Sequence, residues 1–509
     1  MVKNQLRAGV YLSYINLIIS MAIPFFYTPI MLSMLGQAEY GLYSLAASAV
    51  SYLSLLSFGF GSTIIRYISK YRAENNKEAE EITYGFFLLL YCGLAIVVLL
   101  VGFFIANNVE PIFHKGLTIN ELAKMRVLVM IMTFNSALSF PLSIFSSMII
   151  AHEKYIFRRC VDMLSTVAAP IANLIALYLG LGSVGMCMAA TIIQFIMLPI
   201  NVIYCYKKLH IVPKFKKLPP KLIKEMLGFS VFIFMGSIVD MLFWSTDKVI
   251  LGMLTSSVAV AIYNVGGTFN NMIMSLSTSI SGVLTPKITG MVVKNATTEE
   301  LTDLFIKVGR LQFIVIALIV SGFSVFGRAF VTMWAGEAYL EAYWIAILTM
   351  FPLCIPLIQN TGLSIVIAQN KHQFRSIVYL IIAIVNAIST YFVVPTMGII
   401  GAALCSCVAY IIGQGIVMNV YYFKVTGINI PQFWKSIGKM AIIPIIMSLL
   451  GVYVVPYCNI NGWRIFFVAV IIYSLMYAFL MYIFVLNDYE KDIIRKPVNK
   501  LFLKVMHRL

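Results

Sequence analysis

The chain has 509 residues, of which 61% are hydrophobic and only 11% are charged. A soluble globular protein carries roughly 25% charged residues, so this composition excludes an ordinary soluble domain and indicates a membrane protein. The formal net charge is +17, and the eight cysteines lie mostly within apolar runs without metal-ligand spacing. We therefore expect no metal site and no cofactor.

Long apolar segments fill the chain from its first residues. The first one has a basic start and no small-residue cleavage site, so we interpret it as a retained span. A spanning helix needs about 20 mostly apolar residues. Fourteen segments meet this need: 9–33, 40–65, 83–106, 126–151, 160–181, 184–205, 227–250, 257–284, 306–330, 342–367, 374–395, 399–422, 436–456 and 463–486. The loops between them are too short for a catalytic domain, and the five histidines lie in loops or the tail. We therefore expect that the protein is not an enzyme.

The basic residues lie mostly on one side of these spans. Alternating assignment places 31 of the 37 Lys and Arg residues on the side that also holds both termini. By the positive-inside rule, that side is the cytoplasm. This bias explains the net charge without a nucleic-acid partner, and it predicts contacts between the basic loops and membrane lipids.

A short basic loop occurs twice, 217 residues apart. Ala151, Lys154, Phe157 and Arg158 recur as Ala368, Lys371, Phe374 and Arg375. Further blocks match, among them "LGSVGMCMAA" (181–190) with "MGIIGAALCS" (397–406). Six spans in each copy would insert the same way up, which favours two pseudo-twofold lobes around a central cavity and transport by alternating access.

The predicted fold is therefore an all-α polytopic membrane protein of about 14 transmembrane helices. Its two six-helix lobes are followed by two extra C-terminal helices. The predicted domains are an N-terminal lobe at 1–206, a basic cytoplasmic linker at 207–226, a C-terminal lobe at 227–424, two additional helices at 425–487 and a basic cytoplasmic tail at 488–509.

Two segments resemble polysaccharide-biosynthesis flippases of the multidrug/oligosaccharidyl-lipid/polysaccharide exporter superfamily. The first is "AEYGLYSLAASAVSYLSLLSFGFGSTIIRYISKYRAENNKEAEE" (38–81), with its Gly59-x-Gly61 pair and Arg66. The second is "DKVILGMLTSSVAVAIYNV" (247–265). Ser57 departs from the pattern, because relatives often have an acidic residue before the glycine pair.

The resemblance implies a MATE-like flippase in the bacterial cytoplasmic membrane. Such a protein translocates a polyprenyl-pyrophosphate-linked oligosaccharide repeat unit for O-antigen or capsule synthesis. It also implies a proton or sodium ion as the coupling ion and a polymerase of the same pathway as a partner. In the lipid II flippase the two extra helices form a groove for the lipid tail, and the resemblance implies a similar use here. The alternative is a cation-coupled multidrug exporter, which the two extra helices disfavour.

The seventh predicted span has the most charged residues within an apolar run. Spacings of four and seven place Asp240, Trp244 and Asp247 on one helix face, with Lys248 beside it. Charge at mid-bilayer costs about 2.5–3.5 kcal/mol on insertion scales, so it needs a reason. We interpret this face as a cavity wall, with Lys248 as the contact for an anionic substrate and Asp240 as a cation-coupling site. An internal ion pair of Lys248 with either aspartate is the alternative.

Other polar residues extend this candidate site. Gln359 and Asn360 are predicted to line the substrate cavity, although such amides also bond across helices. Lys154, Arg158, Lys371 and Arg375 are topology anchors that would also lie at the cytoplasmic mouth of an inward-open cavity. Arg310 and Arg328 flank the ninth span, and we expect both to snorkel to lipid headgroups.

Overall fold

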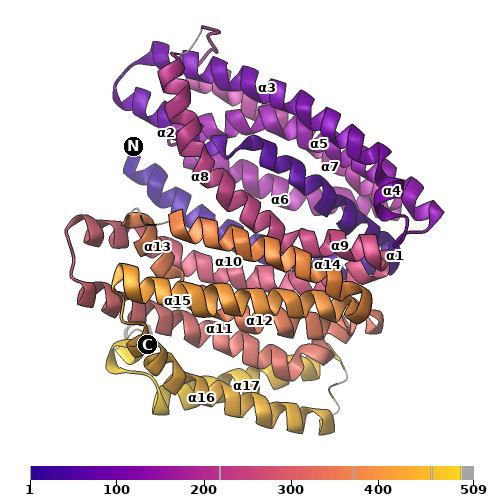
Figure 1. Ribbon diagram of the computed structural model, residues 1–509, viewed down its shortest axis with the longest axis vertical. Coiled ribbons are helices and arrows are strands. Elements are labelled where there is room, and N and C mark those ends of the chain that lie inside the picture. Colours follow the sequence, from indigo (N-terminus) through magenta and orange to yellow (C-terminus); the bar gives the residue numbers. More distant parts are fainter. Residues whose placement is uncertain are drawn as a thin grey trace, which may run out of the picture. The chain divides into compact units, whose positions relative to one another are not determined.

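The computed structural model describes residues 2–216, 219–369, 371, 373–458, 460, 462–492 and 495, and every regular element in them is helical (Figure 1). The described chain divides into two compact units. Unit 1 comprises Met1–Asn264 and Ser376–Ala402, and unit 2 comprises Val265–Arg375 and Ala403–Leu509. The predicted lobes, 1–206 and 227–424, are placed by the sequence repeat, and their boundaries differ from those of the two compact units. The predicted lobe boundaries stay a prediction.

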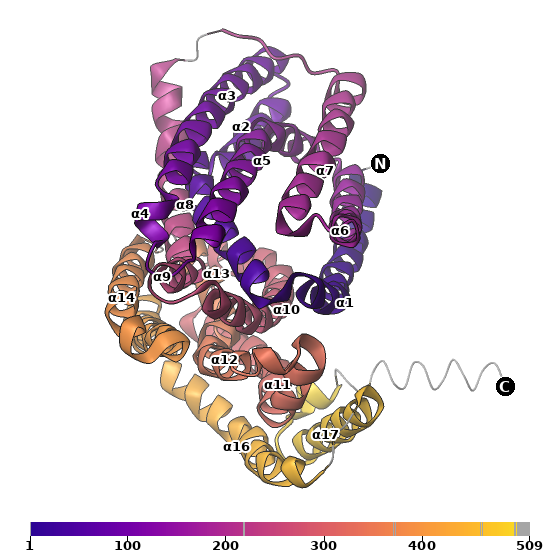
Figure 2. The ribbon, with the colours of Figure 1, turned by 90° about the vertical axis from the view of Figure 1, so that its right-hand side faces the viewer.

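Unit 1 is a bundle of long helices whose outer surface is apolar. Its helices are α1 (Val2–Ser51), α2 (Phe60–Ala73), α3 (Lys77–Asn107), α4 (Val109–Phe113), α5 (Ile119–Ala151), α6 (Tyr155–Tyr178), α7 (Gly182–Tyr204), α8 (Pro220–Trp244) and α9 (Thr246–Leu254). Unit 1 also includes the start of α10 (Ser257–Val293) and most of α14 (Gln373–Tyr410). Figure 2 shows α3 and α5 side by side. Gly102 permits this packing, because a Cβ there would lie 2.1 Å from Thr133 Cγ2. Small residues allow helices to approach closely where lipid supplies no hydrophobic drive.

Unit 2 holds the second half of the chain and the C-terminal helices. Its main elements are most of α10 (Ser257–Val293), α11 (Thr298–Ala335), α12 (Ala342–Ile358), α13 (Asn360–Ala368), the end of α14 (Gln373–Tyr410), α15 (Met418–Tyr421), α16 (Ile430–Val454) and α17 (Trp463–Phe484). α11 begins with a capping box in which Thr297 and Glu300 satisfy each other's backbone N–H groups. α11 packs against α12, α16 and α17.

Ten helices in the described chain are long and apolar enough to cross a membrane, or eleven if the bent pair α12–α13 counts as one span. Two of the ten, Ile15–Ala73 with 59 residues and Gln373–Thr426 with 54, are each long enough for two crossings. Each contains a glycine with non-helical backbone angles, Gly36 or Gly398. α10 has 37 residues but is rich in Ser, Thr and Asn, and it is not among them. If the two long segments count as two spans each, and the bent pair and α10 as one span each, the total equals the fourteen predicted spans. The all-α membrane fold class is confirmed.

Local geometry recurs at the spacing of the sequence repeat. Phe157 stacks on Tyr204 with interplanar angle 11°, and Phe374 stacks on Tyr421 with interplanar angle 10°. Two π-helices begin 217 residues apart, at Cys205 and Tyr422, and each ends at a left-handed residue, His210 or Gly427. Gly182 and Gly398, which the repeat aligns, have φ of +57° and +56°. These recurrences support the predicted repeat.

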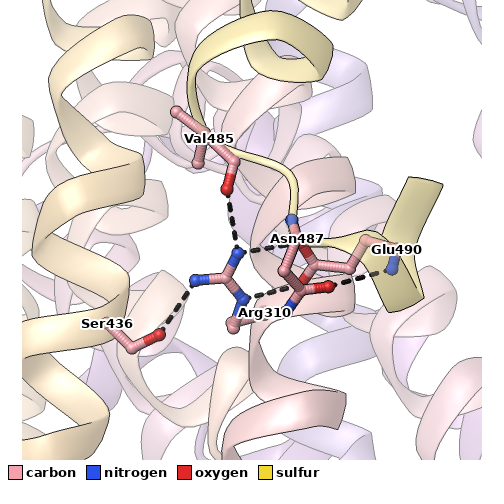
Figure 3. Close-up of polar contacts among 5 residues, drawn as sticks. All are labelled: Arg310, Ser436, Val485, Asn487 and Glu490. Atoms are coloured by element: carbon pink, nitrogen blue, oxygen red, sulfur yellow. Dashed lines mark hydrogen bonds and ion pairs between the residues drawn. The ribbon is translucent and has the colours of Figure 1, made fainter.

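A buried ion pair fixes the C-terminal helices within unit 2 (Figure 3). Arg310 on α11 donates from Nε to Glu490 Oε1 at 2.6 Å and from Nη2 to Oε2 at 2.8 Å. The same guanidinium donates to Ser436 Oγ on α16 and to the carbonyl of Val485 after α17. The Arg310 side chain is 12% exposed and that of Glu490 is 2% exposed. Arg310 therefore does not snorkel to headgroups as predicted, because a carboxylate inside the protein satisfies it.

Candidate substrate cavity

A break in the helix divides the charged cluster of the seventh predicted span. α8 ends at Trp244, Ser245 adopts φ −114° and ψ −29°, and α9 begins at Thr246. Asp240 lies on α8 and is exposed on the protein surface, whereas Asp247 lies on α9 and is 2% exposed. The expected single face of Asp240, Trp244 and Asp247 is therefore interrupted, because helical spacing does not carry across the break.

Lys248 lines a polar cavity of about 350 Å³ within unit 1. Its Nζ donates to Asn264 Oδ1 at 3.1 Å. The amide of Asn264 donates in turn to Tyr40 Oη at 2.6 Å and to Ser44 Oγ at 3.2 Å. Polar groups of the lining come from α1, α6, α9, α10 and the break before α9: Tyr27, Tyr40, Tyr43, Ser44, Ser48, Ser51, Asn173, Ser245, Lys248 and Asn264. One ammonium group among hydroxyls and amides suits an anionic or hydroxyl-rich ligand.

Asp247 is enclosed by hydroxyl groups rather than lining this cavity. Tyr263 Oη donates to Asp247 Oδ2 at 2.6 Å, and Thr390 Oγ1 donates to Oδ1 at 3.3 Å. The three side chains come from α10, α14 and α9, so the carboxylate joins three helices of unit 1. Hydrogen bonds of this kind reduce the cost of burying a carboxylate.

Gln359 and Asn360 lie in unit 2, at the bend between α12 and α13. Gln359 is 2% exposed, and its Nε2 donates to Asn419 Oδ1 at 2.8 Å. Asn360 Nδ2 donates to Ser277 Oγ at 3.3 Å. Both amides thus bond across helices, which was the second of the two sequence interpretations. A role for them in a substrate cavity stays a prediction.

The four basic residues of the repeated loops have different surroundings. Arg158 pairs with Asp162 at 2.6 Å and donates to Ser146 Oγ. Lys371 is exposed and donates to the carbonyl of Val425 at 2.8 Å. Lys154 precedes α6 as its N-cap residue, and Arg375 is half-buried near the start of α14. Arg158 and Lys371 therefore have structural partners, and the place of all four residues at a cavity mouth stays a prediction.

Sequence reasoning missed the groups that surround Lys248 and Asp247. Asn264, Asn173 and Thr390 are polar residues within apolar runs, and this signal alone could have marked them. Their partners come from distant parts of the sequence, since Asn264 meets Tyr40 and Asp247 meets Thr390. One sequence does not reveal those pairings.

The fold is that of transporters of the MOP superfamily. The lipid II flippase MurJ in an inward closed conformation matches with TM-score 0.72 and 15% identity, over 96% of this chain and 99% of that chain. The MATE transporter VcmN of Vibrio cholerae matches with TM-score 0.58 and 13% identity, over 84% and 99%. A MOP superfamily transporter from Pyrococcus furiosus matches with TM-score 0.53 and 15% identity, over 82% and 97%. At these identities the likeness concerns the fold.

A family model described as "Polysaccharide biosynthesis protein" matches residues 6–292, more than half of the chain, and the chain belongs to this family. No curated protein sequence matches it. The family match and the fold together make it a multi-pass membrane protein of polysaccharide biosynthesis.

Proposed function

We propose that this protein is a flippase for a polyprenyl-pyrophosphate-linked oligosaccharide repeat unit. It carries the unit across the bacterial cytoplasmic membrane by alternating access, with both termini in the cytoplasm, and a polymerase of the same pathway uses the product. The family and the fold support this proposal. A proton or sodium ion is the proposed coupling ion.

The observation that carries the proposal is that the chain has two chemically opposite binding surfaces. Unit 1 has the polar cavity with the ammonium of Lys248. Unit 2 has an apolar groove of about 410 Å³. Its lining comes from α11, α12 and α16: Phe313, Ile316, Ala317, Val320, Ser321, Phe351, Cys354, Ala441, Pro444, Ile445, Ser448 and Leu449. A lipid-linked glycan has a polar anionic head and a long apolar tail, and it needs both surfaces.

The alternative, a cation-coupled exporter of small drugs, is disfavoured by this groove. A drug-sized ligand needs one pocket that buries most of its surface. The apolar groove involves α16, which is one of the two helices beyond the repeated twelve. A drug exporter has no evident use for it.

The test is to delete the gene and analyse the lipids and the surface polymer. The proposal predicts that a lipid-linked oligosaccharide accumulates on the cytoplasmic leaflet and that surface polysaccharide is lost. The chemical structure of the accumulated lipid would identify the sugar unit. Unchanged glycolipids together with increased sensitivity to cationic dyes would contradict the proposal and favour the drug exporter.

A further inference from the structure

One face of α11 carries two cavities in succession. Phe313, Ile316, Ala317, Val320 and Ser321 line the apolar groove. Continuing at the same helical spacing, Ser324, Val325, Arg328 and Ala329 line a second cavity of about 410 Å³. At 1.5 Å per residue, the stripe from Phe313 to Arg328 is about 22 Å long, most of the roughly 30 Å hydrocarbon core. The two cavities therefore follow each other along one helix face.

The facing helix α16 shows the same progression. Ala441, Pro444, Ile445, Ser448 and Leu449 line the apolar groove. Val452, Val455 and Pro456, in and just after this helix, line the second cavity. Both helices thus contribute side chains to the two cavities in the same order, so the cavities follow each other along the α11–α16 pair. α12 contributes side chains to both cavities.

Unlike the apolar groove, the second cavity contains a cationic side chain, Arg328, which lies over two aromatic rings. The guanidinium carbon of Arg328 lies 5.0 Å from the ring centre of Trp344 and 5.5 Å from that of Tyr343. Tyr343 is 7% exposed, and its hydroxyl donates to the carbonyl of Ser324, so its ring is fixed. In the described part of the chain, no carboxylate lies within salt-bridge distance of Arg328.

We infer that this second cavity binds the phosphate of the polyprenyl carrier lipid, with the lipid tail in the adjoining apolar groove; this inference rests on the proposed function. A guanidinium that lies over aromatic rings keeps N–H groups available for hydrogen bonds to phosphate oxygens. Trp344 is 46% exposed and offers its remaining surface to the first sugar or to lipid. Charge complementarity with Arg328 thus favours a phosphate in this cavity, next to the apolar groove.

The position of the second cavity along α11 indicates the step of transport at which it would bind the lipid. Arg310 and Arg328 are 18 residues apart on α11, which corresponds to about 27 Å and spans the hydrocarbon core. Arg328 belongs to the end that the positive-inside rule places outside the cell. The site would therefore hold the lipid in the outer leaflet, after the head has crossed and before the lipid leaves.

The test measures binding of a polyprenyl phosphate to the purified full chain in maltoside micelles, which contain no phosphate. The comparison ligands are a polyprenol of the same length, phosphatidylglycerol and inorganic phosphate. We expect polyprenyl phosphate to bind at least tenfold more tightly than any of these. Arg328→Gln should weaken its binding about tenfold, which corresponds to about 1.4 kcal/mol. Trp344→Leu should weaken it about threefold and serves as the second variant if Arg328→Gln does not fold.

Arg464→Gln is the matched control, because Arg464 is also exposed and is predicted to lie on the same side of the membrane. Its affinity for polyprenyl phosphate should stay within twofold of the unmodified chain. Equal affinity of the unmodified chain and both cavity variants would overturn the inference. Phosphatidylglycerol that binds as tightly as polyprenyl phosphate would also overturn it, since Arg328 would then be a general interfacial anchor.

Failure of this inference and failure of the proposed function have different signatures. The binding assay contains no oligosaccharide, whereas the deletion strain reports on the lipid-linked oligosaccharide. If that strain accumulates the oligosaccharide lipid but binding does not depend on Arg328, the inference alone is wrong. If binding depends on Arg328 but nothing accumulates, the proposed function is wrong and the phosphate site remains.

Discussion

Arg310 and Glu490 form an ion pair whose two members depend on each other. The guanidinium uses Nε and Nη2 for the carboxylate and its remaining hydrogen bonds for Ser436 and Val485. Glu490 Oε2 also accepts from the backbone N–H of Asn487 at 3.0 Å. Burial makes each charge costly without the other, so the pair joins α11 and α16 to the segment after α17.

Glu490→Gln should lower the free energy of unfolding by about 3–5 kcal/mol, because it leaves the guanidinium of Arg310 buried without a counter-charge. Unfolding by denaturant in detergent, followed by tryptophan fluorescence, measures this change. The control is the double variant Arg310→Met with Glu490→Met, which should recover most of the loss. If the double variant loses as much stability as the separate Arg310→Met and Glu490→Met variants lose together, the charges are not coupled.

The two aspartates of the seventh predicted span should differ in their effect on transport. Asp247→Asn should reduce polysaccharide export at least tenfold, because the carboxylate accepts from Tyr263 and Thr390 inside unit 1. Asp240→Asn tests the predicted coupling role of the exposed aspartate. If Asp240 couples transport to a cation, its variant should lose the dependence of export on external pH or sodium. Full export by Asp240→Asn across a range of both would end that hypothesis.

At the scale of elements, two glycines make the turns that the repeat aligns. Gly398 has φ +56° and ψ −139°, a region that essentially only glycine occupies. Gly182 has φ +57°, and a Cβ there would lie 2.4 Å from Glu39 Oε1. Glu39 also pairs with Lys124 and accepts from the N–H of Ser183. Position 182 therefore requires glycine both for its backbone conformation and for the lack of space for a Cβ. Position 398 requires it for the backbone conformation alone.

Gly398→Ala should lower the free energy of unfolding by about 1–3 kcal/mol through backbone strain alone. Gly182→Ala should lower it further, because the added methyl group also displaces Glu39. Thermal unfolding in detergent ranks the two variants. Gly93→Ala is the control, since Gly93 lies within α3 with ordinary φ and no neighbour within 4 Å of its added Cβ. Unchanged stability of Gly398→Ala would mean that the turn is not strained.

Ion pairs hold Lys214 and Lys216 of the basic linker against α3 of unit 1. Lys214 Nζ pairs with Glu81 Oε2 at 2.7 Å, and the Lys214 N–H donates to the Glu81 carbonyl at 3.0 Å. Lys216 pairs with Glu78 at 2.6 Å. Gly85 lets the linker backbone approach, because a Cβ there would lie 2.3 Å from the Lys214 carbonyl oxygen.

The hydrogen bond to Glu81 raises the pKa of Lys214 above its ordinary value of 10.5. A raised lysine pKa means that the stabilising effect is complete below pH 10.5, the ordinary pKa, and is lost only as the pH rises through the pKa of the folded state. Hydrogen exchange of the Lys214 amide, corrected for its intrinsic rate, should therefore show constant protection between about pH 6 and 9. Glu81→Gln should reduce this protection across the whole range. If the protection of the Lys214 amide decreases between about pH 6 and 9, a group other than Lys214 and Glu81 holds the linker against unit 1.

For the whole molecule, the sequence was sufficient for the fold class but not for the site. Apolar run length predicts spanning helices because lipid forces the backbone to bond internally, so composition dictates the all-α membrane fold. The break at Ser245 was not predictable, since no proline or glycine marks it. The surroundings of Lys248 depend on Tyr40 and Asn264, which are 224 residues apart and meet only in three dimensions.

Movement of a lipid-linked oligosaccharide between leaflets can be measured with the purified chain. The most direct measurement reconstitutes the purified chain into liposomes with that lipid and follows its accessibility to a glycosidase added outside. We expect the protein to make inner-leaflet lipid accessible, and we expect Lys248→Gln to slow this at least tenfold because the polar cavity loses its cation. Liposomes in which the intact protein leaves the inner-leaflet lipid protected, under proton or sodium gradients of either direction, would contradict the proposed function.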